Sequence, residues 1–340
     1  MKEHQNNFSF LRLVGAILVI YGHSFPITKN TSPNFYIETV QILGIDIFFI
    51  ISGYLITKSW LSDPHVIRYA IRRFLRIFPA LFAVVLVSVF IIGPLFTTLS
   101  LITYFKHPYT REYLSNIFLL VRYNLPGVFT DNAYPVAVNG SLWSLPVEIF
   151  AYIILVPIAL TLYKNKYKTF CSFFVFLVFV ALQITFRNRE LVVYGVRIVD
   201  LVRLLPFFFM GSFIAVSGFQ KYLNLQVAFI LLIFLLVLPE MNLHLKEILN
   251  YFFLPYIILS LGLSEKAFFS GLNNYGDYSY GLYLYGFLIQ QSVSCKIGVS
   301  SGPLLNFVFG LLIAFVCAFL SWHLLEKKML SIKPKTRILL

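Results

Sequence analysis

The sequence carries little charge for its length, and acidic residues are especially scarce. Only 12% of its 340 residues are Asp, Glu, Lys or Arg, and 14 acidic residues stand against 27 basic ones. Soluble globular proteins carry about 25% charged residues and about 45–50% apolar ones. Here 59% of the residues are hydrophobic and the mean hydropathy is +0.81. One aqueous core cannot bury so much apolar surface, so we exclude a soluble protein and expect lipid as the solvent.

Cysteine is also rare, which excludes a disulfide-stapled fold. Cys171, Cys295 and Cys317 lie in or beside apolar runs, and no two of them form a C-x-x-C pair. Residues in such surroundings usually behave as small packing residues. The cysteines therefore predict neither a disulfide framework nor a metal site, and we expect no metal.

What the sequence has in abundance is long apolar runs. A membrane-spanning helix needs about 20 mostly apolar residues. The first run holds Arg12 and has no clear small-x-small cleavage site after His23, so we expect a retained helix rather than a signal peptide. The sequence predicts an all-α polytopic membrane protein with about ten transmembrane helices, at 8–27, 36–60, 77–98, 142–163, 169–186, 196–217, 223–239, 244–263, 278–294 and 304–325.

The formal charge of +13 first suggests nucleic acid as a partner. The basic residues are scattered between apolar runs, which is typical of cytoplasmic loops rather than of a nucleic-acid surface. With ten spans and the N-terminus inside, the inner segments hold about twice as many Lys and Arg residues as the outer ones. We therefore expect both termini in the cytoplasm, and we expect membrane lipids rather than nucleic acid as a partner. Attraction of the basic loops to anionic lipid or to a phosphorylated ligand is a weaker possibility.

The chain shows no internal repeat and no low-complexity tract. We expect one multi-span membrane domain at 1–330 and a basic cytoplasmic tail at 331–340. The connection 99–140 is long and rich in Tyr, Pro and Asn, and loops of that length usually have a function. On the predicted topology it faces outward as a lid or acceptor platform, or it forms a partly re-entrant packing segment.

Arg12 and His23 lie inside the first apolar span. Eleven helical steps place both side chains on one face, about 16 Å apart along the axis. Ionisable groups at membrane depth are expensive and mark pathways or sites. A neutral histidine can act as a general base on a hydroxyl, and the alternative is an interfacial histidine bonded to a neighbour.

Two carboxylates lie within or beside apolar spans. Asp46 can orient His23, or it can pair with Arg12 or Arg203. Glu148 follows Ser141 and Ser144 at the predicted start of a helix, and these three residues share one helical face. Either serine can cap that helix. Glu148 is predicted at the same membrane level as His23.

Arg72, Arg73 and Arg76 form a compact cationic cluster where the third predicted span begins. Arginine forks recognise phosphate with two parallel hydrogen bonds. The alternative is ordinary topology-setting charge at the inner side of the membrane.

Several motifs together resemble the membrane-bound acyltransferase 3 family, in the order seen there. They are FLR at 10–12 with His23, GIDIFF at 44–49 with SGYL at 52–55, RRxxRIxP at 72–79, SLWSLxxE at 141–148, RLLPFFFMG at 203–211 and SYGLYLY at 279–285. Each motif alone is weak, but their combination covers nearly the whole chain.

The resemblance implies an enzyme that transfers an acyl group, most often acetyl, from cytoplasmic acyl-coenzyme A to an extracytoplasmic carbohydrate. The acceptor would be a glycan such as lipopolysaccharide O-antigen or exopolysaccharide, or a lipid-linked oligosaccharide, and the location would be the bacterial inner membrane. By the same resemblance Arg12 and His23 form the family's Arg-x10-His pair, the cluster Arg72, Arg73 and Arg76 binds the coenzyme, and Glu148 is the helix-start glutamate.

From these observations we expect catalytic roles for His23, Glu148, Asp46 and Arg12. His23 would deprotonate the acceptor hydroxyl while Asp46 or Glu148 orients its ring, and a covalent acyl-His23 step remains open. Substrate binding is expected from Trp143, Ser141 and Arg203. Trp143 and Tyr134 can stack on a sugar ring or anchor at the interface.

One position departs from the family pattern, because Gly286 stands where many members carry histidine. Either that histidine is dispensable here or the acceptor geometry differs. The main alternative function is a secondary transporter of a small polar or sugar substrate, which intramembrane charges and a Pro-containing helix also suit. A non-catalytic scaffold is a third possibility.

Overall fold

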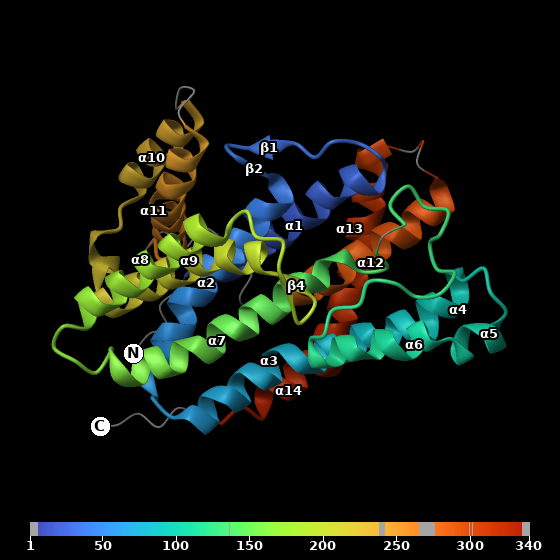
Figure 1. Cartoon of the computed structure of the whole chain (residues 1–340), viewed down its shortest axis with the longest axis horizontal. Helices are drawn as coiled ribbons and strands as arrows, with labels where there is room; N and C mark the ends of the chain where they lie inside the picture. The colour runs from blue at the N-terminus through green and yellow to red at the C-terminus, as the bar shows by residue number, and fades with distance from the viewer. Residues whose placement is uncertain are drawn as a thin grey trace.

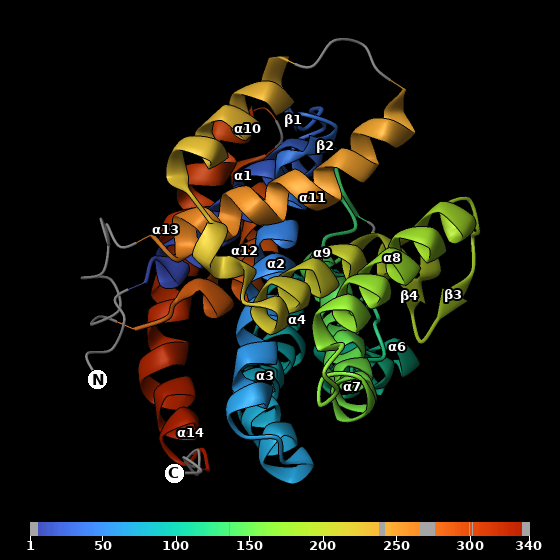
Figure 2. The same ribbon diagram turned by 90° about the vertical axis from the view of Figure 1, so that its left-hand side faces the viewer.

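The computed structural model describes residues 6–135, 137–237, 242–264, 276–298, 300 and 302–334. These residues form a bundle of long helices with two very short β-hairpins (Figures 1 and 2). In this part of the chain, eight helices are long and apolar enough to cross a membrane. The prediction of an all-α polytopic membrane protein is confirmed.

Each of the ten predicted spans coincides with a helix of the structure. The helices are α1 (Phe8–Ile27), α2 (Val40–Ser62), α3 (Val66–Val87), α7 (Ser144–Thr161), α8 (Lys168–Phe186), α9 (Ile198–Ser217), α10 (Leu225–Val237), α11 (Leu243–Gly262), α12 (Ser279–Ile297) and α13 (Gly302–Ser321). Two of them differ from a typical span: α10 is apolar but short over its described residues, and α12 is long enough but less apolar. α12 is more polar because it carries the tyrosines and glutamines that face the interior.

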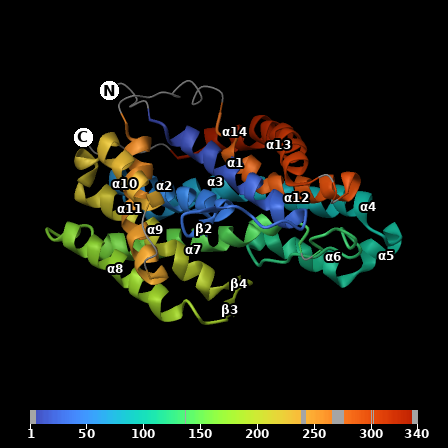
Figure 3. The ribbon, with the colours of Figure 1, turned by 90° about the horizontal axis from the view of Figure 1, so that it is seen from above.

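At the centre of the bundle, α2 packs between α1 and α9. α12 packs against α1 as well (Figure 3). Glycines let these backbones touch, as small residues do between membrane helices. A Cβ at Gly44 of α2 would lie 2.4 Å from the Gly15 oxygen of α1, and one at Gly53 would lie 1.9 Å from the Phe208 oxygen of α9. With the further contacts of Gly22 with Gln41 and of Arg203 with Asp46, they show that α1 runs antiparallel and α9 parallel to α2.

Ion pairs and packing define two ends of the bundle. Arg12 near the start of α1 and Arg76 in α3 meet Asp277, just before α12. We call this the arginine end. α1 and α12 run side by side from there, since Gly286 faces Ile20 and Ser294 reaches Ile27, so His23 lies at the opposite, histidine end. The hairpin of β1 (Asn34–Phe35) and β2 (Glu38–Thr39) links α1 to α2 at the histidine end.

The third span starts earlier than the sequence predicted. We expected it at residue 77, but α3 begins at Val66, where His65 caps the backbone N–H of Arg68. Arginine is a strong helix former, so a basic first half does not end the helix. The span continues through a π-helical turn, η1 (Ser88–Ile92), into α4 (Gly93–Phe96).

The connection 99–140 is ordered rather than open. It holds α5 (Leu101–Lys106), α6 (Pro108–Tyr113) and the 3₁₀ turn η2 (Leu114–Phe118), and Thr97 bridges back to Val128. The 3₁₀ turn η3 (Gly140–Trp143) then leads into α7. Asn139, not Ser141 or Ser144, caps this entry by accepting a bond from the Ser141 N–H at 3.2 Å, so the expected serine cap was wrong.

Five further elements lie in the described part of the chain. β3 (Val192–Val193) and β4 (Val196–Arg197) pair between α8 and α9, and the 3₁₀ turn η4 (Phe219–Tyr222) follows α9. After α13 the chain continues through the π-helical turn η7 (Trp322–Glu326) into α14 (Lys327–Ser331). The predicted tail 331–340 is described only as far as residue 334.

The three cysteines are free thiols. Cys171 and Cys317 are partly buried and Cys295 is exposed, so two of the three pack as predicted.

Candidate active site

A cavity of about 340 Å³ lies at the arginine end and extends into the bundle between α1, α2, α3, α7 and α12. We call it the arginine cavity, because Arg12, Arg73 and Arg76 line it. Lys333, beyond α14, adds a fourth cation, while the acidic lining residues are Asp277 and Glu148. The surplus of positive charge suits a ligand with several negative charges.

Asp277 joins two of these arginines. Its Oδ2 accepts bonds from Arg12 at 2.9 Å and from Arg76 at 2.7 Å, although 265 and 201 residues separate them in the chain. Burial alone would raise the pKa of Asp277, but the charges of Arg76 and Arg12 outweigh it and lower that pKa. Asp277 is therefore ionised, and it holds both guanidinium groups at the cavity wall.

Lys333 has no such carboxylate partner among the described residues. Burial, followed by the positive charges of Arg73, Arg76 and Arg12, lowers its pKa to about 8. Cations crowd together in this way where a binding site gathers them for an anionic ligand.

The three arginines of the predicted cluster do not all line the same cavity. Arg73 lies over the ring of Tyr152, 5.9 Å from its centroid, and Arg76 reaches Asp277, so both line the arginine cavity. Arg72 instead bonds Asp63 at 2.8 Å and lies away from the cavity, buried to 7% exposure. Bonds from Arg68 and Arg72 lower the pKa of Asp63, in spite of its burial. Positions 72 and 73 point about 100° apart on a helix, which separates their surroundings.

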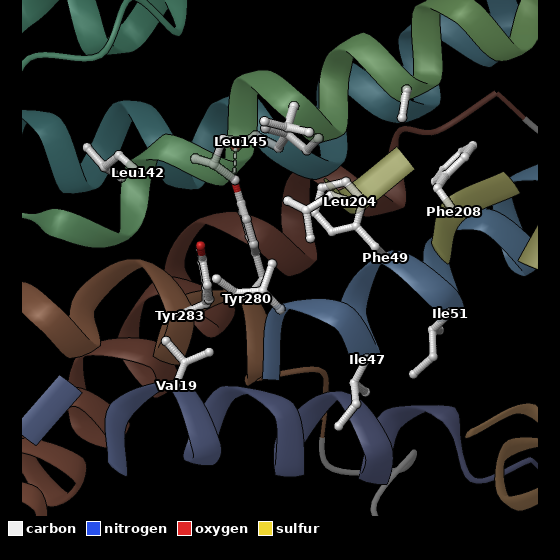
Figure 4. Close-up of a cluster of buried hydrophobic side chains, with 14 of the residues drawn as sticks. Val19, Ile47, Phe49, Ile51, Leu142, Leu145, Leu204, Phe208, Tyr280 and Tyr283 are labelled. Atoms are coloured by element: carbon white, nitrogen blue, oxygen red, sulfur yellow. Dashed lines mark hydrogen bonds between the residues drawn. The ribbon is translucent and has the colours of Figure 1, made fainter. Parts of the chain in front are cut away.

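Deeper in the arginine cavity lies a group of polar side chains around Glu148. Its Oε1 accepts a bond from Ser52 of α2 at 3.3 Å and another from Tyr152, one turn along α7. Ser144 lines the cavity one turn before Glu148 and bonds Tyr283 of α12. Tyr283 also donates to the Ser141 carbonyl oxygen at 2.7 Å, so Ser141 lies beside Tyr283. Figure 4 shows Tyr283 pointing from α12 toward the helix that carries Leu145.

His23 lies beyond the deep end of the arginine cavity and does not line it. Its ring stands edge-on to Phe287 at 5.0 Å between centroids, and Tyr134 of the 99–140 connection contacts Phe287 at 6.0 Å between centroids. Its Nδ1 is buried and bonds no other side chain among the described residues. Tyr280, Tyr283 and Phe287 follow one another on one face of α12, and this face leads from the cavity to His23.

The two predicted orienting carboxylates have other partners. Asp46 bonds Arg203 at 3.0 Å, one of the pairings that its position allowed, and Arg203 also bonds Glu38 at 3.0 Å. Glu148 is held by Ser52 and Tyr152. Neither carboxylate contacts His23, so the structure does not bring together the predicted histidine–carboxylate pair.

Besides His23, Arg72, Asp46 and Ser141, three further predicted positions lie outside the arginine cavity. Trp143 packs half-buried against the core, and Arg203 lines a second cavity described below. Gly286 faces α1, where a Cβ would lie 2.6 Å from Ile20, so a larger side chain would push the two helices apart.

Sequence reasoning missed several cavity residues. Asp277, Tyr152, Tyr283, Trp322 and Lys333 all line the arginine cavity. Asp277 lies two residues before the recognised SYGLYLY stretch, and an acidic residue among so few was a usable signal. Trp322 reaches the wall from the π-helical turn η7, and such turns often mark functional sites.

The fold and this site define a polytopic membrane protein with a charged internal cavity. The chain belongs to the acyltransferase 3 family, whose "Acyltransferase domain" model matches residues 5–323. It is 31% identical to an "O-acetyl transferase" of Shigella phage Sf6 over 337 residues, which cover 96% of this chain and 97% of that protein. It is also 30% identical over 179 residues to "Nodulation protein 10" of Rhizobium leguminosarum bv. viciae, covering 48% of this chain and 46% of that protein. No solved structure was found to match.

The protein is therefore an integral membrane acyltransferase, and its similarity to an O-acetyl transferase supports transfer to oxygen. This favours an enzyme over the transporter and scaffold alternatives.

Proposed function

We propose that this enzyme moves an acyl group, most simply acetyl, from cytoplasmic acyl-coenzyme A across the membrane to a hydroxyl of an extracytoplasmic carbohydrate. The observation that carries the proposal is the arginine cavity, with its excess of cations at one end of the bundle and His23 beyond its deep end. On the predicted topology the arginine end is cytoplasmic. The relatives named above support the acyl transfer.

The residues of the arginine cavity fit the coenzyme's phosphates. Arg73, Arg76 and Lys333 would hold them at the mouth, and Arg12 would contact the pantetheine arm as it enters. An anion arriving here competes with Asp277 for Arg12 and Arg76. Hydrogen bonds between charged groups contribute about 1.5–3 kcal/mol each, enough to select a phosphate-bearing donor.

The thioester would arrive at the depth of Glu148 and Ser144. We assign Glu148 the role of a positioning residue there, since Ser52 and Tyr152 hold it fixed. Tyr283 and Phe287 lie between this depth and His23, so the thioester end of the pantetheine arm would have to pass them along α12 to reach His23. The proposal no longer includes orientation of His23 by Asp46 or Glu148, because neither carboxylate contacts His23.

At the histidine end the acceptor hydroxyl loses its proton to His23, and its oxygen attacks the thioester carbonyl carbon. The carbon–sulfur bond breaks, an ester forms, and the coenzyme thiolate takes a proton. His23 is half-buried, and an imidazole in its neutral form can accept the proton. Asp46, held by Arg203, would support the shape of this end without contacting the reacting atoms.

The test uses the purified protein in lipid vesicles with acetyl-coenzyme A labelled in the acetyl group. Thermal stabilisation by acetyl-coenzyme A, lost when Arg73 and Arg76 are both changed to Ala, is the expected binding result. Mass spectrometry of surface glycans from cells with and without the gene should show a lost acetyl mass. Unchanged glycans together with an unaltered melting curve would refute the proposal.

A further inference from the structure

A second cavity, of about 330 Å³, lies at the histidine end among α8, α9, α11 and the β2 strand before α2. We call it the paired-charge cavity. Ligand pockets begin at about 300 Å³, so it has room for one small ligand. None of its lining residues lines the arginine cavity.

The charges that line the paired-charge cavity balance one another. Arg203 is bonded to Glu38 at 3.0 Å, and Arg187 lies 4.0 Å from Glu247. Behind Arg203 stands Asp46, at 3.0 Å. An anionic ligand would meet two carboxylates here and a cationic ligand two guanidinium groups. A neutral ligand would be repelled by neither the carboxylates nor the guanidinium groups.

The same walls are rich in hydrogen-bonding groups of both kinds. Asn250 and Gln183 line the cavity beside the ring of Tyr251. Gln183 is 5% exposed, and its Oε1 is buried without a hydrogen-bond partner among the described residues. Nη2 of Arg203 is likewise buried without a hydrogen-bond partner among the described residues. Buried groups of this kind are normally satisfied, so their presence indicates a ligand that donates and accepts hydrogen bonds.

The paired-charge cavity is also close to the proposed site of transfer. The first turn of α2 touches α1 next to His23, since a Cβ at Gly22 would lie 2.3 Å from the Gln41 side chain. Glu38 lies only three residues before Gln41. Glu38 therefore places the cavity lining directly before the turn of α2 that touches α1 beside His23.

We propose that the paired-charge cavity binds a neutral sugar residue of the acceptor glycan, next to the residue that is acylated. A pyranose ring carries adjacent hydroxyls that donate and accept at once, and it has no net charge. The proposal rests on the proposed function for the identity of its ligand. It adds a location, a set of residues and a preference against acidic sugars.

The experiment measures saturation-transfer NMR of methyl α-D-glucopyranoside, methyl α-L-rhamnopyranoside and methyl β-D-glucuronide on the full chain. The protein is held in lipid nanodiscs, because glycoside detergents would compete. We expect signals from at least one neutral glycoside and a much weaker one from the glucuronide. Binding of the glucuronide equal to that of the neutral glycosides, or no binding of either neutral glycoside, would overturn the proposal.

Two matched variants locate the site. Asn250→Leu should reduce the neutral signal about fivefold or more, as the loss of one or two hydrogen bonds predicts. Asn124→Leu alters the rival hollow in the 99–140 connection, which Leu99, His107 and Asn124 line, and should leave the signal unchanged. The reverse pattern would place the sugar in the connection and overturn the proposal.

A charge variant separates recognition from folding. Glu247→Gln removes one negative charge from the cavity and should raise glucuronide binding relative to the neutral glycosides, an effect that misfolding cannot produce. An unchanged preference would count against the proposal. Acetyl-coenzyme A stabilisation, measured on every variant, reports folding at the other end of the bundle. If wild-type protein binds the neutral glycoside but not acetyl-coenzyme A, the proposed function fails and the sugar site stands.

Discussion

The two cavities of this bundle are similar in size but opposite in electrostatic design. The arginine cavity gathers Arg12, Arg73, Arg76 and Lys333 against Asp277 and Glu148, whereas the paired-charge cavity matches each lining arginine with a carboxylate. An excess of one charge selects a charged ligand, and a balanced set selects hydrogen-bonding shape. On the proposals made above, the molecule would separate recognition of a phosphate-bearing donor from recognition of a neutral acceptor.

His23 lies outside both cavities, at the end of the bundle where the second one opens. Phe287 separates it from the arginine cavity. We therefore expect that separate substitutions can impair ligand binding and acyl transfer independently.

The largest expected effect is on chemistry at the histidine end. His23→Ala should lower acetyl transfer by about 10²–10⁴-fold, because a general base contributes that much. Stabilisation by acetyl-coenzyme A should persist, since His23 does not line the arginine cavity. Transfer to glycan is followed with labelled acetyl-coenzyme A in vesicles. Transfer near the wild-type rate would remove His23 from the mechanism.

The next effect distinguishes two neighbouring arginines. Arg73→Ala should raise KM for acetyl-coenzyme A about 10- to 100-fold, the equivalent of one lost charge-assisted hydrogen bond. Arg72→Ala is the matched control, because Arg72 bonds Asp63 and lies away from the cavity. It should lower the melting temperature and leave KM near the wild-type value. Equal KM changes in both variants would indicate a general electrostatic effect rather than a contact.

A smaller effect is a pH dependence of donor binding. The pKa of Lys333 is lowered to about 8 in the free protein, and a bound polyanion would raise it. Lys333 is protonated well below pH 8, so affinity for acetyl-coenzyme A should fall as pH rises through about 8 toward the pKa of the bound state. One contact of this kind predicts a decrease of about tenfold at most. Titration calorimetry at several pH values measures it.

Lys333→Arg serves as the control for that pH dependence. Arginine stays charged throughout this range, so the decrease in affinity should be absent. A decrease of the same size in Lys333→Arg would assign the titration to another group.

The smallest effect on activity is expected where the chain departs from its family. Gly286→Ala places a Cβ 2.6 Å from Ile20, and such overpacking costs about 1–3 kcal/mol of stability. Gly286→His should lower the melting temperature further and should not increase transfer, because α1 leaves no room for the ring. Increased transfer by Gly286→His would show that this site can use the family's usual histidine.

Local patterns in the chain predicted much of this architecture. All ten predicted segments are helices, and eight of them are long and apolar enough to cross a membrane, because an apolar run of about 20 residues is a strong and local signal. The ends of the spans were less certain. In α3, basic residues such as Arg72 suggested a loop, but arginine forms helix readily. The order of short motifs was sufficient to indicate the family.

The candidate site was only partly predictable. Arg12, Arg73, Arg76 and Glu148 were found and do line one cavity. Arg72 differs from Arg73 only by its direction on α3, and no local pattern indicated that Asp63 would take it. Asp277 was missed because its partners lie more than 200 residues away in the chain.

The sequence by itself determined that this chain is a helical membrane protein of the acyltransferase 3 family, because composition, span length and motif order are properties of short segments. Only the tertiary structure decided which charges share a cavity, which carboxylate pairs with which arginine, and that His23 stands apart from both acids. Those outcomes depend on the faces that packed helices turn toward one another, and that information is distributed over the whole bundle.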